Sequence, residues 1–442
     1  ASFAAQLRQQ AEDWANVAEY SAKHFAAEKP LPFVVWQGDP CETLAPLARP
    51  TSAPLTEVKV VTLQNEWESA CLNLSNLTSR TRYVRVRPHP PTGEVKALPR
   101  DKVTIREVTQ VAVEQKYGAP VIYADFLPQA NEAFYFVLPP WESRQVWLTL
   151  DTRGLEPGEY VLPLVVAEVA PELSGETINL VVRVRPVALP PSDTFQSCWW
   201  SYRWWDVHPS WALYQAEHYV NLFPGVGIPL GEFDEQGNMV KPPDFTQVDA
   251  YVKLRRSAGP ARFLFNEPFI GVPEAFDMEE VALVAGRLVE MKPRARRMYE
   301  QWLPLVVQHL KDIGLDYEDW AFYPIDEPSR GPTCLIASLS KAAKQIDSKV
   351  RFYIDFISGY DVYDLDLILP YIDFFCPQPD FGFQTKWGRE MVRRIVAAGK
   401  ETVCYGIVGV TSTWRPYRLM PWQCAKFGLT GAGGWVFIHQ PY

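Results

Sequence analysis

The sequence predicts two domains, an N-terminal antiparallel β-sandwich and a C-terminal (β/α)8 barrel of the TIM type. The chain has 442 residues, which is too long for one ordinary hydrophobic core. Short strand-like segments without intervening helices occupy residues 31–190, whereas strand-like and helix-like segments alternate over residues 191–442. We therefore expect a leading helix within residues 1–30, a sandwich domain over 31–190 and a barrel domain over 191–442.

The N-terminal part changes its hydrophobic period after the first helix. Leu7, Trp14 and Val17 recur at near-helical spacing, which indicates a helix that lies on another element. From about residue 33 the period becomes two, as in strands with one buried face. The expected strands are Val58–Leu63, Glu68–Leu74, Arg82–Arg87, Val103–Val113, Ala133–Leu138, Arg144–Leu150, Tyr160–Val169 and Thr177–Val187. Pro190 and Pro191 then break the pattern and predict a linker.

The C-terminal part contains eight candidate strands, each separated from the next by a helical stretch such as Leu335–Ile346 or Met278–Ile313. The strands are expected at Ser197–Trp200, Gly225–Leu230, Ala261–Asn266, Trp320–Asp326, Arg351–Phe356, Ile372–Pro377, Thr402–Ile407 and Gly434–Ile438. Eight alternating units most simply close into a parallel barrel. A doubly wound open sheet is the alternative, but it would have a glycine-rich phosphate loop after an early strand, and the sequence has none there.

Composition excludes several classes of partner. The net charge is -9 with a pI of about 5.4, and no long basic run offsets it, so nucleic acid and anionic membranes are not expected partners. No apolar run is long enough for a membrane span. Seven Cys without CxxC spacing and six His without ligand spacing predict no metal site, and we expect no cofactor. No secretory signal is present, but the chain opens with Ala1 as a processed chain would. We expect a secreted or periplasmic protein, with a cytoplasmic one as the alternative.

The strongest catalytic candidates are Asp326 and Glu327, which end the fourth predicted barrel strand. Active sites of such barrels lie at the C-terminal ends of the strands. Cleavage of a glycosidic bond needs an acid for the leaving oxygen and a second group that stabilises the oxocarbenium-like centre. Neighbouring strand residues point to opposite faces, so the two acids share a site only if the strand bulges or ends there. We expect Pro328 to end the strand and to hold Glu327 in an extended conformation. A strand-to-helix turn with acids near the helix start is the structural alternative.

Other polar and aromatic residues fall at the same expected end of the barrel strands. We expect a sugar substrate to contact Trp200, Asn266, Glu267, Tyr353, Asp355, Gln378, Tyr405, Trp414 and Trp435. The Asn-Glu-Pro at 266–268 has the form of the acid motif in a large clan of retaining glycosidases, where it ends strand four and the nucleophile ends strand seven. Here it ends the third expected strand, and Glu401 lies at the beginning of the seventh. Glu267 is therefore expected to contact or orient the substrate, and a purely structural role is equally open.

A sandwich followed by a barrel whose fourth strand ends in Asp-Glu-Pro at 326–328 resembles glycoside hydrolase family 123 and its uncharacterised relatives. The closing segment Gly-Ala-Gly-Gly-Trp at 431–435 adds to the resemblance. The resemblance implies β-N-acetylgalactosaminidase activity by a substrate-assisted retaining mechanism, in which the 2-acetamido oxygen attacks the anomeric carbon and forms an oxazoline-like intermediate. It further implies that Asp326 orients the acetamido N–H and that Glu327 acts as acid and then as base. By strand position, the candidates that enclose the acetamido methyl group are Tyr353, Tyr405, Trp414 and Trp435.

Two other functions stay open. A glycosidase of another specificity would combine Asp326 and Glu327 with Glu267 or Asp355. A non-catalytic carbohydrate-binding protein would hold a sugar on the Trp-rich rim without cutting it. In each case the expected partner is a glycan or glycoconjugate, and the sequence indicates no oligomeric state.

Overall fold

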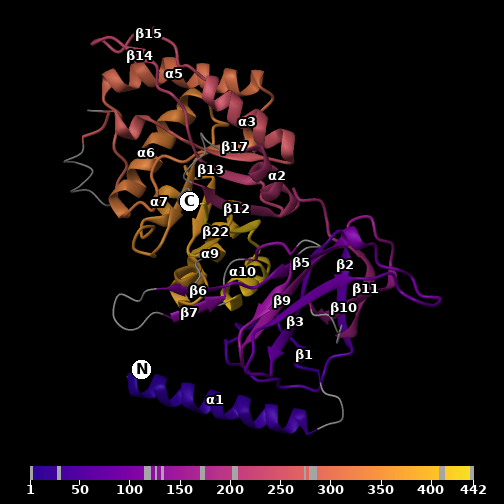
Figure 1. The fold of residues 1–442 in the computed structure, drawn as a ribbon. Coiled ribbons are helices and arrows are strands. Elements are labelled where there is room, and N and C mark those ends of the chain that lie inside the picture. The colour runs from indigo at the N-terminus through magenta and orange to yellow at the C-terminus, as the bar shows by residue number, and fades with distance from the viewer. Residues whose placement is uncertain are drawn as a thin grey trace. The chain divides into compact units, whose positions relative to one another are not determined.

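The computed structural model describes residues 3–26, 31–113, 121–124, 127–130, 134–169, 175–201, 208–272, 275–277, 286–407 and 414–438. The chain divides into two compact units, Ala1–Pro190 and Pro191–Tyr442, and each is described by itself (Figure 1). Within the described ranges, no helix combines the length and the apolar composition that a membrane span requires. The chain is thus a multi-domain protein, and its second unit alternates strands with helices.

In its described residues, the first unit contains one long helix, a short 3₁₀ helix (Arg100–Lys102), two large sheets and a small hairpin. A four-stranded sheet has the order β1 (Phe33–Gln37), β3 (Trp67–Asn76), β9 (Ser143–Asp151) and β5 (Val103–Glu107). A five-stranded sheet has the order β2 (Glu57–Gln64), β11 (Gly175–Ala188), β10 (Gly158–Glu168), β4 (Arg82–Pro88) and β8 (Phe136–Leu138). All neighbours in both sheets are antiparallel except β2 and β11, which are parallel. The hairpin pairs β6 (Gln110–Val113) with β7 (Val121–Ala124).

One hydrophobic core lies between the two large sheets of the first unit. In the five-stranded sheet, β2, β10 and β11 alternate buried residues with more exposed ones, whereas β1 and β3 of the other sheet are buried along most of their length. Buried side chains of both sheets pack together, among them Leu72, Leu148, Val60, Leu164 and Val182. Helix α1 (Phe3–Phe25) is attached separately: the Ser21 hydroxyl donates to the Leu77 carbonyl at 2.9 Å. The leading helix therefore packs on elements of its own unit.

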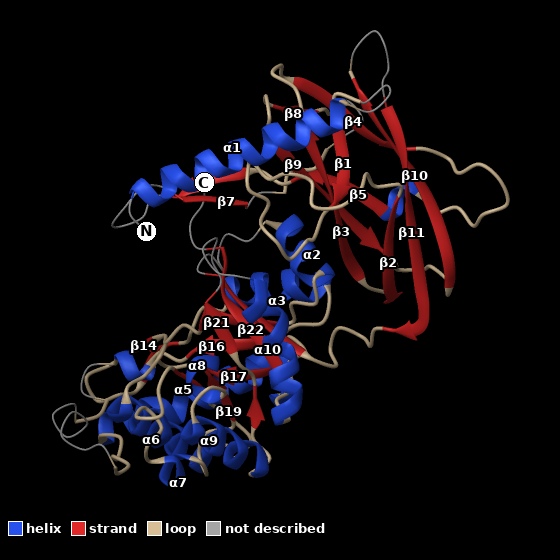
Figure 2. Cartoon of the chain, turned by 90° about the horizontal axis from the view of Figure 1, so that it is seen from below, coloured by secondary structure: helices blue, strands red, loops and turns tan. Residues whose placement is uncertain are grey.

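The second unit contains parallel strands and the helices that connect them (Figure 2). Its strands are β12 (Gln196–Ser201), β13 (Leu222–Gly227), β16 (Arg262–Asn266), β17 (Trp320–Phe322), β18 (Tyr353–Phe356), β19 (Phe374–Pro377), β20 (Glu401–Thr402), β21 (Tyr405–Ile407) and β22 (Gly431–Ile438). Its helices are α2 (Pro209–Glu217), α3 (Thr246–Ala258), α5 (Pro293–Asp312), α6 (Arg330–Ile346), α7 (Leu365–Ile368), α8 (Pro379–Gly382), α9 (Lys386–Ala397) and α10 (Trp414–Phe427). A short antiparallel hairpin, β14 (Glu232–Phe233) with β15 (Met239–Lys241), follows β13.

The parallel strands form a six-stranded sheet of order β17-β16-β13-β12-β22-β21 and a three-stranded sheet of order β18-β19-β20. An isolated parallel bridge between Phe322 and Phe352 joins β17 to the start of β18. At the other side, β20 and β21 are consecutive segments separated by Val403 and Cys404. The pairings therefore follow chain order from β12 to β20, and β22 pairs with β12.

Alternation along these strands separates two layers of buried side chains. In β16, Phe263 and Phe265 pack in a large cluster with residues of α3, α5 and α6, whereas Leu264 between them belongs to a smaller cluster. The smaller cluster draws members from β12, β13, β16, β17, β18, β19, β21 and β22 or from residues next to them: Cys198, Trp200, Leu222, Leu264, Ala321, Tyr323, Tyr353, Phe374, Cys376, Val403, Tyr405 and the half-buried Trp435. It is called the inner cluster below. Side chains alternate along a strand, so a residue just past the carboxyl end of a strand that lies an even number of positions from an inner-cluster residue is expected at the carboxyl-end side of this cluster.

Several predicted boundaries were wrong. The fourth barrel strand ends at Phe322 rather than Asp326, because Tyr323 makes the last ladder bond, to Phe265 O at 2.8 Å, and Pro324 has no N–H to continue it. The second strand begins earlier, at Leu222, and a register shift beside Gly225 with φ of 92° carries it past Pro224. The expected strand Val103–Val113 is divided into β5 and β6, because the chain changes partner from β9 to β7. Residues 278–285 of the expected long helix lie outside the described ranges.

Candidate active site

Asp326 and Glu327 lie in the loop between β17 and α6, at the carboxyl end of the parallel strands. Both side chains are exposed. Because the strand has already ended, the alternation that would send neighbouring side chains to opposite faces does not apply to them. The condition under which the two acids share one site is therefore met by a loop rather than by a bulge.

The buried Asp355 in β18 is linked to both acids by hydrogen bonds. The Tyr323 hydroxyl lies 2.5 Å from Asp326 Oδ1 and 2.6 Å from Asp355 Oδ2. The other Asp355 oxygen, Oδ1, accepts the Glu327 backbone N–H at 3.0 Å. One buried carboxyl group thus fixes the position of Asp326 through Tyr323 and that of Glu327 directly.

The backbone of Glu327 differs from the expectation. Its φ is +43°, in the left-handed region, so Pro328 does not hold it extended. Such a conformation costs a non-glycine residue about 1–3 kcal/mol and persists only where surrounding contacts impose it. Here the contacts are the bond to Asp355 and a second one at the side chain, where the Tyr405 hydroxyl donates to Glu327 Oε1. Together they turn the carboxylate toward strand β21.

The aromatic residues expected at the site lie at different depths. Tyr405 is buried, with its ring 5.1 Å from that of Trp200, and only its hydroxyl reaches Glu327. Tyr353 is fully buried in the inner cluster, where its ring meets that of Tyr323 edge to face at 4.8 Å. Tyr353 and Asp355 therefore support the exposed acids and present no surface to a ligand in this conformation. Trp435 is half-buried beside the same cluster.

Three of the remaining candidates lie at strand ends. Asn266 is exposed at the last position of β16, and Gln378 is half-buried between β19 and α8. Trp414 is the first residue of α10, and its side chain lies outside what the structure describes. Asn266 and Gln378 can be reached from solvent at the same end of the strands as the acid pair.

Glu267 does not join the acid pair. Its side chain is buried, and Oε2 accepts the Phe269 N–H at 3.0 Å. Burial raises the pKa of Glu267 to about 8. Its charge acts on Tyr299 of α5, which belongs to the cluster between strands and helices. The structural role that the sequence left open fits this placement, because the carboxyl group holds the turn after β16.

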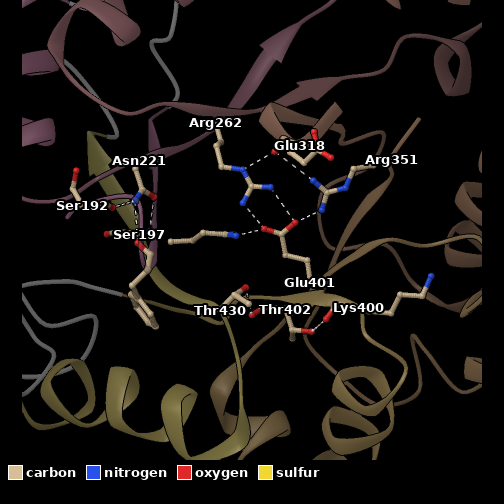
Figure 3. A network of polar contacts seen from close by, with 12 residues as sticks. Ser192, Ser197, Asn221, Arg262, Glu318, Arg351, Lys400, Glu401, Thr402 and Thr430 are labelled. Atoms are coloured by element: carbon tan, nitrogen blue, oxygen red, sulfur yellow. Dashed lines mark hydrogen bonds and ion pairs between the residues drawn. The ribbon is translucent and has the colours of Figure 1, made fainter. Parts of the chain in front are cut away.

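Glu401 occupies the opposite end of the strands. Its carboxylate accepts hydrogen bonds from Arg262, Arg351 and Gln196, with 3.1 Å between Arg262 Nη2 and Glu401 Oε2 (Figure 3). Burial alone would raise the pKa of Glu401, but the hydrogen bonds and charges of the two arginines outweigh it and hold the pKa below its ordinary value. The acid of the seventh strand is thus an ionised partner of two guanidinium groups at the amino ends of the strands.

Sequence reasoning missed Tyr323, which holds Asp326. Ala321 and Tyr323 are two residues apart and both belong to the inner cluster, so strand alternation could have predicted that Tyr323 points inward. The loop that brings Asp326 within hydrogen-bond distance of Tyr323 could not be predicted from the sequence. It also missed Arg330, the first residue of α6, which forms a two-point ion pair with Asp364 at 2.7 and 2.8 Å. That pair ties the end of the acidic loop to the segment after β18. Among the described residues, no group of His, Cys, Asp and Glu side chains is arranged to hold a metal ion.

Comparisons with known proteins give a likeness at the level of fold. No family model matches the chain, and no curated protein matches it. A solved family 123 glycoside hydrolase from Clostridium perfringens, studied for glycolipid glycan hydrolysis, superposes with a TM-score of 0.64 at 11% identity, over 87% of this chain and 75% of its own. That coverage includes part of each unit. The chain therefore shares its fold with a glycoside hydrolase.

Two family 5 glycoside hydrolases match less well. A xyloglucanase from Bacteroides ovatus has a TM-score of 0.34 at 8% identity, over 86% of this chain and 92% of its own. An enzyme from Prevotella bryantii B14 has a TM-score of 0.32 at 11% identity, over 55% and 88%. These two scores are too low to support an argument.

Proposed function

We propose that this chain is a glycoside hydrolase that releases terminal β-linked N-acetylgalactosamine, or a related N-acetylhexosamine, by a retaining, substrate-assisted mechanism. The observation that carries the proposal is the exposed pair Asp326 and Glu327 at the carboxyl ends of parallel strands, both held by the buried Asp355. The likeness in fold to a family 123 glycoside hydrolase supports the same class of reaction.

The proposal includes the architecture. We take residues 191–442 as a (β/α)8 barrel, on the grounds that the parallel pairings follow chain order, that β22 pairs with β12 and that eight of the parallel strands, or residues next to them, contribute to the inner cluster. We take the two sheets of residues 31–190 as a β-sandwich, since one core lies between them. The catalytic residues then all belong to the barrel domain.

In the first step, the acetamido oxygen of the bound sugar attacks the anomeric carbon while the bond to the leaving oxygen breaks. Glu327 gives its proton to that oxygen, and the sugar becomes an oxazoline-like intermediate. Asp326 accepts the acetamido N–H and stabilises the positive charge that develops on the group. In the second step, water adds to the anomeric carbon, Glu327 takes the proton from the water, and the acetamido group is restored.

The surroundings of the pair favour a nucleophile supplied by the substrate. A retaining enzyme that uses its own nucleophile has two carboxyl groups about 5–5.5 Å apart on either side of the bond. At β21 the side chain facing Glu327 is Tyr405, and Glu401 is bound to two arginines at the other end of the strands. Asp355 is 1% exposed and engaged with Tyr323 and Glu327, so it is not presented to an anomeric carbon.

The test is hydrolysis of a matched pair of aryl glycosides, an N-acetyl-β-galactosaminide and the corresponding β-galactoside. We expect cleavage of the first and at least about a hundredfold lower kcat/KM for the second, because only the first carries the internal nucleophile. Equal cleavage of both would favour a glycosidase that uses another mechanism. Binding of the sugars without turnover would favour a carbohydrate-binding protein.

A further inference from the structure

The Tyr323 hydroxyl lies within hydrogen-bond distance of two carboxyl groups at once. The distances are 2.5 Å to Asp326 Oδ1 and 2.6 Å to Asp355 Oδ2. A phenol has one hydrogen and donates to only one acceptor at a time in so short a bond. If both carboxyl groups were ionised, one contact would bring two oxygen lone pairs together with no hydrogen between them. The geometry therefore requires one further proton, and that proton belongs to a carboxyl group.

The position of that proton follows from burial. Asp326 is exposed, so water solvates its charge, whereas Asp355 is 1% exposed. The hydrogen-bond partners of Asp355, the Tyr323 hydroxyl and the Glu327 N–H, are uncharged groups. A buried carboxylate without a cationic partner is strongly disfavoured against its protonated form. The proton therefore resides on Asp355.

The groups around Asp355 agree with this assignment. The titratable side chains that interact electrostatically with Asp355 come from five strands or strand ends. All of them are acids or neutral donors: Cys198, Tyr323, Asp326, Tyr353, Cys376 and Tyr405. Burial raises the pKa of Asp355 well above its ordinary value, and the charge of Asp326 raises it further, against the opposing hydrogen bond from Tyr323.

We propose that Asp355 is a neutral carboxylic acid and a positioning residue for both catalytic acids. Its Oδ2–H donates to the Tyr323 oxygen, Tyr323 in turn donates to Asp326 Oδ1, and its Oδ1 accepts the Glu327 N–H. The chain of donors points outward and ends at an ionised Asp326, which is the form that accepts an acetamido N–H. The catalytic consequence rests on the proposed function, but the protonation of Asp355 does not.

Two substitutions separate a neutral from an ionised Asp355. In Asp355→Asn the amide N–H donates to Tyr323 and the carbonyl oxygen accepts the Glu327 N–H, which reproduces the neutral acid bond for bond. Asp355→Ala removes both bonds. We expect Asp355→Asn to keep kcat within about fivefold of wild type and Asp355→Ala to lose at least about a hundredfold, each with the wild-type circular dichroism spectrum. An ionised Asp355 would accept a hydrogen bond at each of its two oxygens, and Asn has only one acceptor oxygen. A folded Asp355→Asn variant as inactive as Asp355→Ala would therefore overturn the proposal.

A second measurement needs no substrate. At neutral pH both Glu267, whose pKa burial raises to about 8, and Asp355 should contribute to the infrared carbonyl absorption of protonated carboxyl groups. The Asp355 contribution should be lost in Asp355→Asn, and the full absorption should be kept in Asp380→Asn, a control at an exposed carboxylate. Identical spectra for wild type and Asp355→Asn in this region would overturn the assignment. If the Asp355 contribution is present but no glycoside is cleaved, the proposed function fails while the protonated Asp355 stands, so the two failures are distinguishable.

Discussion

The backbone N–H of Glu327 donates to Oδ1 of Asp355 at 3.0 Å, across 28 residues of sequence. This bond links the loop after β17 to strand β18 and holds Glu327 at a φ of +43°. The position of Glu327 is thus set by a buried residue on the next strand rather than by the strand that precedes it. Each prediction for the acid pair depends on this arrangement.

The acid pair should be essential. We expect Glu327→Gln and Asp326→Asn each to lower kcat on an aryl N-acetyl-β-galactosaminide by at least about a hundredfold, because the first removes the transferable proton and the second the charge that faces the acetamido group. Steady-state kinetics measure both. Glu235→Gln changes an exposed acid in the turn between β14 and β15 and should leave kcat unchanged. A Glu327→Gln enzyme with near-normal turnover would remove Glu327 from the mechanism.

Asp326 should matter only for substrates that carry an acetamido group. If a slow β-galactoside activity is measurable, Asp326→Asn should reduce it by less than about tenfold, since no N–H is there to be oriented. A thiazoline mimic of the intermediate should inhibit wild type and bind Asp326→Asn at least about tenfold more weakly. Equal losses on both substrates would instead indicate a role for Asp326 in general charge stabilisation.

Tyr405 should affect turnover more than substrate affinity. Its hydroxyl donates to Glu327 Oε1, so Tyr405→Phe frees the carboxylate from one orientation without adding volume. We expect kcat to fall about tenfold with KM within about twofold, which is the range for losing one hydrogen bond. Tyr360→Phe is the matched control, since Tyr360 is 61% exposed. A rise in KM alone would mean that Tyr405 contacts the sugar instead.

Glu267 should make stability depend on alkaline pH. Burial raises its folded pKa to about 8, above the unfolded value of about 4.3, so its contribution to stability is fully present below pH ~4 and is lost as pH rises through about 8. Glu267→Gln keeps the carbonyl acceptor for Phe269 and removes this titration. Denaturant unfolding should show the variant gaining about 2–4 kcal/mol on wild type between pH 5 and pH ~9. A constant difference across that range would contradict the assignment.

Glu401 should contribute stability with the opposite sign. Its folded pKa lies below its ordinary value, so the contribution is present above the unfolded pKa of about 4.3 and is lost as pH falls through the folded pKa. At pH 7, Glu401→Gln leaves Arg262 and Arg351 without their carboxylate and should cost about 3 kcal/mol, measured by urea unfolding. Glu300→Gln breaks an exposed ion pair with Arg296 and should cost less than about 1 kcal/mol.

The sequence predicts that Asp326 and Glu327 end a barrel strand, whereas in the structure they lie in the loop after β17, which ends at Phe322. Hydrophobic alternation and the alternation of strands with helices are local signals, so they locate a strand better than they locate its last residue. Strand alternation also predicts the direction of Asp355. Tyr353 and Asp355 are two positions apart in one strand, so an inward Tyr353 implies an inward Asp355. The conformation of Glu327 could not be predicted, because a hydrogen bond to another strand overrides the local preference before Pro328. The burial of Tyr353 and of Glu267 depends on other segments that pack over them, and a local sequence pattern does not predict those contacts.

The Glu401 carboxylate has a kinetic consequence. Its partners Arg262 and Gln196 lie 139 and 205 residues away in sequence. Contacts of such span close large chain loops, so we expect them to form late, after the intervening strands and helices. Interactions that are absent from the folding transition state change the unfolding rate more than the folding rate. We therefore expect Glu401→Gln to raise the unfolding rate of this unit more than it lowers the folding rate, from the end of the strands opposite to the acid pair.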